Sequence, residues 1–276
     1  MSTDINSWDA AASGWDANTA LIRAWLSQPT QEMLDAAQLG PGMRVLDVAA
    51  GAGDQTLDIA DRVTSAGEVL ATDISPRMVA LANERLRTAG RHWARAEVAD
   101  AEAVLPNRGG FDAALCRLGL MLCASPLQAL VAMRHALKPG GRVAALVFSK
   151  PEANPCITIL MGTARRHAGL PSGGLPPPAS LLSLGRPGLL AELAHEAGFD
   201  GVEVQPVAAP FRLPAAANYL EFVRSAGSPI LDILRPLPEA VQHRAWQDIE
   251  VQLEQFSTTD GWVGPNELLL FSASRS

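Results

Sequence analysis

The residues with the clearest chemical potential form a glycine-containing segment near residue 50. Residues 45–56 read VLDVAAGAGDQT, in which an apolar strand is followed by a Gly-x-Gly turn and the start of a helix. Gly51 and Gly53 allow the backbone to pass close beneath a ligand and to offer amide donors. A dinucleotide fingerprint requires a third glycine where this chain has Thr56. Asp47, just before the loop, would sit badly beside a pyrophosphate, but a carboxylate there can hold an ammonium or an amide.

Two more acidic residues follow the next predicted strands. Asp73 ends the second strand, 20 residues after Gly53, and Asp100 follows the third strand, with Ala101 next to it. An acid at the first position can accept hydrogen bonds from both ribose hydroxyls, and one at the second can reach an adenine amino group. Each acid alone is also compatible with a helix cap or a solvated loop residue. Three acids at the carboxyl ends of consecutive strands indicate one shared site.

The segments that must position these residues alternate between strands and helices. This alternation predicts right-handed crossovers and an α/β fold with a parallel sheet. Residues 1–40 are expected to be helical, with a second helix restarting at Pro29. The expected strands are 44–48, 67–73, 92–98, 111–116, 142–148, 199–207 and 267–273, and the expected helices between them are 56–63, 75–88, 126–137 and 189–197.

Two irregular inserts interrupt this pattern. The first is rich in proline and holds a short helix at 157–167, and the second holds helices near 215–226 and 239–256. Connections that leave the carboxyl ends of strands surround the ligand crevice of such sheets, so we expect the inserts to form a substrate lid. The predicted organisation is a helical arm (1–40), a core (41–150, 189–210 and a terminal strand in 262–276) and two lid inserts (151–188 and 211–261).

Five stretches of the chain carry a family resemblance. They are VLDVAAGAG (45–53), ATDIS (71–75), VADAEAVLP (98–106), FDAALCRLGLMLC (111–123) and LKPGGRVAALVF (137–148). With them the chain resembles class I S-adenosylmethionine-dependent methyltransferases, and among these the small-molecule enzymes of the ubiquinone/menaquinone-biosynthesis type. The resemblance implies a doubly wound, mostly parallel, Rossmann-like sheet of seven strands with the last antiparallel. It also implies S-adenosylmethionine as cofactor and methyl transfer to oxygen, nitrogen or carbon of a small-molecule acceptor.

The resemblance further implies the cofactor contacts. Ala49 stands where many members of the family have the first glycine of the loop, and its methyl group is small enough to fit. The implied contacts are Asp47, Ala49, Gly51 and Gly53 for the methionine part, Asp73 for the ribose, Ile74 and Met78 for the adenine face, Asp100 and Ala101 for the adenine edge, and Arg117 and Leu118 at the sulfonium end.

Candidates for the acceptor side lie in the arm and the inserts. Met161, Tyr219 and Phe222 are expected to form walls of the acceptor pocket. Trp15 in the arm either closes over the ligands or anchors the arm by apolar packing. His167 and Tyr219 could reach the acceptor as catalytic groups; the alternatives are an exposed or structural role for the histidine and helix packing for the tyrosine.

Arg117 is the third catalytic candidate. The strand that it ends is otherwise apolar, and a desolvated guanidinium needs an anionic partner. That partner is either an internal carboxylate such as Asp47 or Asp112, or the carboxylate of the cofactor, or an anionic or enolisable group on the acceptor that Arg117 would orient.

Composition limits the other possibilities. The 276 residues are 48% hydrophobic and 18% charged, which indicates a globular chain, and the net charge of −7 argues against general affinity for nucleic acid or anionic lipid. The longest apolar run, residues 143–148, is too short to span a bilayer. Three cysteines without a C-x-x-C pair predict neither a metal site nor a disulfide framework. Without a secretory signal, the expected location is the cytoplasm.

Two other functions stay open on these residues. One is a nicotinamide-dependent oxidoreductase, which Thr56 and Asp47 disfavour. The other is a protein that binds S-adenosylmethionine without transferring its methyl group. The oligomeric state is also open, and a homo-oligomer is compatible with the sequence.

Overall fold

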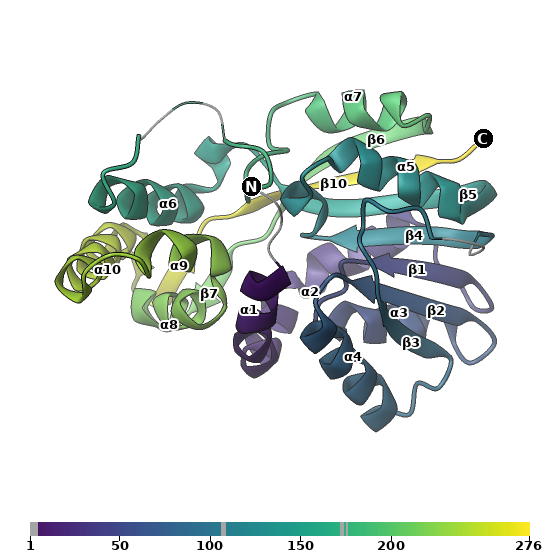
Figure 1. The fold of residues 1–276 in the computed structure, drawn as a ribbon, viewed down its shortest axis with the longest axis horizontal. Helices are drawn as coiled ribbons and strands as arrows, with labels where there is room; N and C mark the ends of the chain where they lie inside the picture. Colours follow the sequence, from purple (N-terminus) through teal and green to yellow (C-terminus); the bar gives the residue numbers. More distant parts are fainter. Residues whose placement is uncertain (1–4, 106–108, 172–173, 175) are drawn as a thin grey trace.

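A seven-stranded sheet forms the core of the protein in the computed structural model, which describes residues 5–105, 109–171, 174 and 176–276. The strand order is β3-β2-β1-β4-β5-β10-β6 (Figure 1). β10 runs antiparallel to both of its neighbours, whereas β1, β2, β3, β4 and β5 pair in parallel. The predicted α/β fold is thereby confirmed. The strands are β1 (Arg44–Val48), β2 (Glu68–Asp73), β3 (Ala94–Val98), β4 (Phe111–Arg117), β5 (Leu137–Phe148), β6 (Asp200–Ala208) and β10 (Glu267–Ser274).

Helices cover both faces of this sheet. α2, α3 and α4 lie along one face and α5 and α7 along the other (Figure 1). Local signals set where they begin: Ser75 caps α4 by accepting a hydrogen bond from the Met78 N–H at 3.1 Å, and Pro76 occupies the first turn. These helices are α2 (Thr19–Ala36), α3 (Asp54–Val63), α4 (Pro76–Thr88), α5 (Pro126–Ala136) and α7 (Leu189–Glu196).

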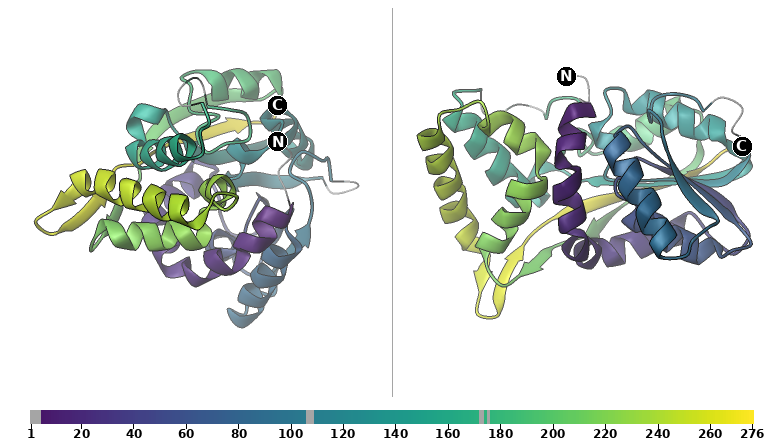
Figure 2. Two further views of the ribbon diagram at one scale, coloured as in Figure 1. Left: turned by 60° about the vertical axis from the view of Figure 1, so that its left-hand side comes forward. Right: turned by 60° about the horizontal axis from the view of Figure 1, so that its bottom comes forward.

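A second layer of helices lies beyond the carboxyl ends of the parallel strands. It contains α6 (Pro155–His167), α8 (Ala216–Ala226), α9 (Ser228–Leu234) and α10 (Glu239–Leu253). A small antiparallel sheet of β7 (Phe211–Leu213), β9 (Gly261–Gly264) and β8 (Ser257–Thr258) joins this lid to the core. Figure 2 shows α1 (Ile5–Ala17) between the lid helices and the core, and α1 contacts α4, α8 and α9.

Several sequence expectations are wrong in detail. The arm breaks at Asn18 rather than at Pro29, which is buried inside α2. One hydrogen bond is lost there, and the buried face of α2 compensates for it. β5 begins at Leu137 rather than at residue 142, and its register with β4 shifts between Phe111 and Ala113. The helix expected to reach residue 256 ends at Leu253 and continues as a short 3₁₀ turn.

The lid also holds elements that the sequence did not predict. They are α9 and the small sheet, whose strands are only two to four residues long. Segments this short carry no measurable alternation of apolar and polar residues. Among the described residues, no helix combines the length and the apolar character that crossing a bilayer would need.

Candidate cofactor and acceptor site

The glycine loop between β1 and α3 forms one wall of a cavity. Ala49, Gly51 and Gly53 all have positive φ, at 54°, 57° and 81°; glycine adopts this backbone region freely, whereas at Ala49 it costs roughly 1–2 kcal/mol. Ala49 and Gly51 line the cavity. A Cβ added to Gly51 would meet nothing within 4 Å, which leaves open space above the loop.

Gly53 has a different role from the one implied by the resemblance. It does not line the cavity, and a Cβ there would lie 2.9 Å from the Ala82 Cβ on α4. This glycine is therefore needed for the close approach of α3 and α4. A similar steric relation explains Ala49, because a Cβ on Gly119 would overlap the Ala49 Cβ. Gly119 thus makes the room that the Ala49 methyl group takes up.

Asp73 lies at the carboxyl end of β2 and lines the cavity beside Ile74 and Met78. One carboxylate oxygen accepts a hydrogen bond from the Gly51 N–H and the other from the Ser75 N–H, both at 2.9 Å. Burial raises the pKa of Asp73, and these backbone donors oppose the shift. Each oxygen keeps a lone pair, so the carboxylate is fixed in place and still able to accept from two hydroxyls.

Asp100 and Ala101 line the same cavity after β3. Asp100 accepts a hydrogen bond from the Glu102 N–H at 2.9 Å, and Glu102 in turn accepts one from the Ala124 N–H at 2.7 Å. The three predicted strand-end positions are therefore brought to one edge of the sheet, although not all of them reach the cavity.

Asp47 is the exception. It is fully buried and does not line the cavity. Its carboxylate accepts hydrogen bonds from the side chains of Gln55 and, at 2.6 Å, Thr56. Burial raises its pKa from 3.8 to about 7. The expected direct contact with the ligand is wrong: Gln55 lines the cavity instead, and its Oε1 is buried without a hydrogen-bond partner among the described residues.

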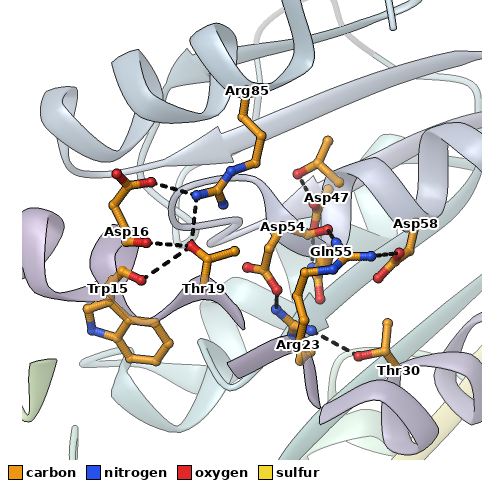
Figure 3. Close-up of polar contacts among 12 residues, drawn as sticks. Trp15, Asp16, Thr19, Arg23, Thr30, Asp47, Asp54, Gln55, Asp58 and Arg85 are labelled. Carbon is orange, nitrogen blue, oxygen red and sulfur yellow. Dashed lines mark hydrogen bonds and ion pairs between the residues drawn. The ribbon is translucent and has the colours of Figure 1, made fainter. Parts of the chain in front are cut away.

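Arg117 ends β4 and finds its partner inside the protein. Its guanidinium donates to Asp54 at 2.5 Å and to the Thr30 hydroxyl at 2.9 Å (Figure 3 labels both partners). The side chains of Arg117 and Asp54 are only 7% and 11% exposed. Burial would raise the pKa of Asp54, but the adjacent Arg117 outweighs it and holds that pKa below its usual value.

The expectation that Asp47 or Asp112 is the internal partner of Arg117 is wrong, because the partner is Asp54. Asp47 is bound by Gln55 and Thr56, and Asp112 pairs with Lys138 and accepts from the Arg44 N–H. Asp54, at the first position of α3, has the right distance and burial. Arg117 and Leu118 still line the cavity, so both could contact a ligand.

The acceptor-side candidates come together across the cavity from the glycine loop. Trp15, Met161, Tyr219 and Phe222 all line it. Trp15 donates from its indole N–H to the Ala226 carbonyl at 3.1 Å and meets Phe222 edge-on at 6.2 Å between ring centroids. It therefore both anchors the arm and forms part of the wall.

Tyr219 is buried and makes no hydrogen bond with the described residues. Its ring packs against Phe211 at 5.0 Å and Trp262 at 5.1 Å. Burial raises its pKa well above the usual value. At neutral pH this side chain is thus a neutral phenol, which can donate a hydrogen bond but cannot act as a phenolate base.

His167 does not reach the cavity. Its Nε2 lies 2.7 Å from an oxygen of Asp248, so it links α6 to α10 within the lid. The expectation that it could reach an acceptor is wrong, because the end of α6 that carries it packs on the neighbouring lid helix.

Three aromatic residues of the cavity wall, Trp25, Phe148 and Phe211, were missed from the sequence. Trp25 of α2 stacks on Phe211 of β7 at 4.1 Å, and both line the cavity together with Phe148. The Trp25 indole N–H donates to the Ala209 carbonyl at 2.7 Å. The arm, the core and the lid therefore each contribute a ring. Helical spacing places Trp25 in a helix but does not say which face it presents.

The fold and the cavity are of the kind found in class I S-adenosylmethionine-dependent methyltransferases. The family model described as "ubiE/COQ5 methyltransferase family" matches residues 22–159. This chain belongs to that family.

Known relatives and structures agree with this assignment. The ubiquinone/menaquinone biosynthesis C-methyltransferase UbiE of Idiomarina loihiensis is 39% identical over 119 residues, which are 43% of this chain and 47% of that protein. The chain spans about half the length of the curated relatives it matches. The YcgJ protein of Bacillus subtilis superposes with a TM-score of 0.62 and 18% identity, covering 91% of this chain and 99% of that one. Phosphoethanolamine N-methyltransferase 2 of Haemonchus contortus, solved with S-adenosylmethionine, superposes with a TM-score of 0.54 and 18% identity, covering 90% of this chain and 52% of that one. These two likenesses show the fold.

The residues present fit S-adenosylmethionine, the cofactor of this class. The fixed lone pairs of Asp73 suit the two ribose hydroxyls, and the space above Gly51 is open. The unpaired Gln55 Oε1 can accept from an ammonium group. We therefore expect the nucleoside at Asp73 and Asp100 and the methionine part along the glycine loop.

Proposed function

We propose that the protein transfers the methyl group of S-adenosylmethionine to an apolar small molecule bound between the glycine loop and the lid. One observation carries this proposal: the same cavity is bordered by the cofactor-side residues and by the aromatic residues of the lid. Asp73 and Gly51 stand on one side of it, and Tyr219 and Phe222 on the other. A ligand on the lid side would thus adjoin the bound cofactor.

Methyl transfer requires the protein mainly to align the acceptor with the methyl group of the cofactor. The bound cofactor supplies a methyl group activated by the positive sulfonium. Leu118, held at a positive φ of 60° at the end of β4, and Phe222 would pack the acceptor against it and exclude water. Tyr219 would orient the acceptor by donating a hydrogen bond. No histidine of the described part lines the cavity, so we propose an acceptor that reaches its nucleophilic form without a protein imidazole.

The acceptor of the relatives is not carried over. Their names describe C-methylation in ubiquinone and menaquinone biosynthesis, but the family match ends at residue 159. Tyr219 and Phe222 lie outside it. We propose only an apolar acceptor, methylated on carbon, oxygen or nitrogen. We further propose that the protein acts in the cytoplasm, as a monomer or a homo-oligomer. The net charge of −7 supports the proposal that it binds no nucleic acid.

Ligand binding and methyl transfer test the proposal separately. Calorimetry should show binding of S-adenosylhomocysteine and no binding of NAD; the opposite result would favour an oxidoreductase. Labelled S-adenosylmethionine then identifies an acceptor from a panel of apolar small molecules. Cofactor binding without transfer to any acceptor would favour a non-methylating protein.

Variants of the lid then locate the acceptor. Phe222→Ala should weaken the apparent affinity for the acceptor about 10- to 100-fold, because it removes buried apolar contact, and should change that for S-adenosylhomocysteine less than twofold. Val251→Ala on α10, at an exposed position outside the cavity, is the matched control. A larger loss for the cofactor than for the acceptor would place the acceptor pocket elsewhere.

A further inference from the structure

Arg85 on α4 places an incompletely paired cation in the cavity wall. Its Nη2 donates to Asp16 at 2.6 Å and to the Thr19 hydroxyl at 2.8 Å. Its Nη1 is buried and has no hydrogen-bond partner among the described residues. Figure 3 shows Asp16 and Thr19 on one side of this guanidinium and Asp54 on the other. A buried charged donor without an acceptor is costly, which indicates that a ligand supplies the missing partner.

The neighbouring arginines cannot take this role as readily. Arg117 donates to Asp54 and Thr30. Arg23 donates to the Asp54 carbonyl at 2.8 Å and to Asp58 at 2.7 Å, and unlike Arg85 it does not line the cavity. Of the three arginines around Asp54, only Arg85 keeps a buried nitrogen unpaired within the described part of the chain.

A complementary unpaired atom lies on the same part of the wall. Gln55 follows Asp54 at the start of α3, and its buried Oε1 has no partner within the described residues. Arg85 is close enough to Asp54 to help lower the pKa of that residue, after burial and Arg117. The wall beside the glycine loop thus offers one unpaired cationic donor and one unpaired neutral acceptor.

We propose that Arg85 and Gln55 hold the amino-acid end of the bound cofactor, with Arg85 Nη1 donating to its carboxylate and Gln55 Oε1 accepting from its ammonium. This inference rests on the proposed function, because it takes the nucleoside to lie at Asp73 and Asp100. The opposite polarity of the two atoms matches a zwitterion. Since Arg85 is also bonded to Asp16 on α1 and Thr19 on α2, the cofactor carboxylate would connect the arm to the core.

Two ligands that differ only at this end provide the test. S-adenosylhomocysteine carries the amino-acid group, whereas 5′-methylthioadenosine has the same nucleoside and thioether without it. By calorimetry, Arg85→Met should weaken S-adenosylhomocysteine about 10- to 100-fold and leave 5′-methylthioadenosine within twofold. Arg85→Lys, which keeps the charge and loses the fork, should show a smaller loss for the first ligand only. Gln55→Met should likewise affect only the first.

Arg87→Met is the matched control, because Arg87 lies on the same helix, is exposed and pairs with Glu84. It should leave both affinities unchanged. An equal loss of both ligands in Arg85→Met and Arg85→Lys would overturn the inference and give Arg85 a role only in holding the arm. Unchanged affinities would also overturn it. A wild-type protein that binds neither ligand would instead contradict the proposed function, and the inference with it.

Discussion

Replacement of Arg117 by methionine tests whether the ion pair beneath the cavity holds the fold together. The side chain of Arg117 is 7% exposed and that of Asp54 is 11% exposed, so methionine would leave a buried carboxylate without its main partner. Breaking a buried pair in this way costs about 3–5 kcal/mol. Arg23 and Arg85 also lower the pKa of Asp54, so we expect a value near the lower end, about 3 kcal/mol.

The free energy of unfolding should depend on pH in opposite directions in the wild type and in Arg117→Met. In the wild type the pKa of Asp54 is lowered from 3.8, so this group contributes stability above that pH and loses it as the pH falls. In Arg117→Met, burial raises the pKa of the same carboxyl. A raised pKa favours the folded state only while the group is protonated, so the contribution is lost as the pH rises above about 4. The stability gap between the two proteins should therefore widen from pH 5 to pH 8.

Urea unfolding followed by tryptophan fluorescence measures both effects. The double variant Arg117→Met/Asp54→Asn removes the unpaired charge, so it should be more stable than Arg117→Met at pH 8. Its loss of stability should be smaller than the sum of the losses in the single variants Arg117→Met and Asp54→Asn. The reasoning is refuted if Arg117→Met costs less than about 1 kcal/mol with an unchanged m-value, or if the two single losses add.

Three further predictions concern the cavity wall and the buried residue Asp47 behind it. Burial raises the pKa of Asp47 to about 7, so the wild type should lose stability as the pH rises from 4 to 8; Asp47→Asn should remove about 4 kcal/mol of this loss in urea titrations, and equal pH profiles would contradict the burial argument. Gly119→Ala should cost about 1–3 kcal/mol in thermal unfolding because of its overlap with Ala49, and this cost should be smaller when the same substitution is made in an Ala49→Gly protein; an equal cost in both proteins would rule out this contact as the cause. Asp73→Ala should weaken S-adenosylhomocysteine by about 1.5–3 kcal/mol in calorimetry, and an unchanged affinity in a folded variant would disprove the ribose assignment.

The cofactor half of the site could be predicted because its signals are local in the sequence. A strand, a positive-φ turn and a helix start follow one another within residues 45–56, and the carboxyl ends of parallel strands must meet at one sheet edge. The positions of Asp73 and Asp100 follow from this rule alone. The rule does not say which carboxylate reaches the cavity. For that reason Asp47 was expected to contact the ligand, although it is buried behind Gln55 and Thr56.

The partners of buried charges could not be predicted, because they come from distant segments. The sequence shows that Arg117 needs an anionic partner. It does not show which one, because Asp54 is 63 residues away in the chain and other acids are equally plausible candidates. The lid was expected from the position of its inserts, whereas its short strands and the orientation of His167 depend on tertiary packing. Pro29 shows the same limit: a residue that ends most helices is retained here on the buried face of α2.

The N-terminal arm connects the two halves of the site physically. Trp15 contacts the lid through the Ala226 carbonyl and Phe222, while Asp16, the next residue, pairs with Arg85 on the cofactor side at 2.6 Å. Consecutive residues of α1 thus touch both ligand regions, and Trp25 of α2 stacks against the lid residue Phe211. A cofactor that fixes Arg85 would therefore also fix α1, and with it the Trp15 wall of the acceptor pocket. Because such coupling is reciprocal, cofactor and acceptor should each bind more tightly in the presence of the other.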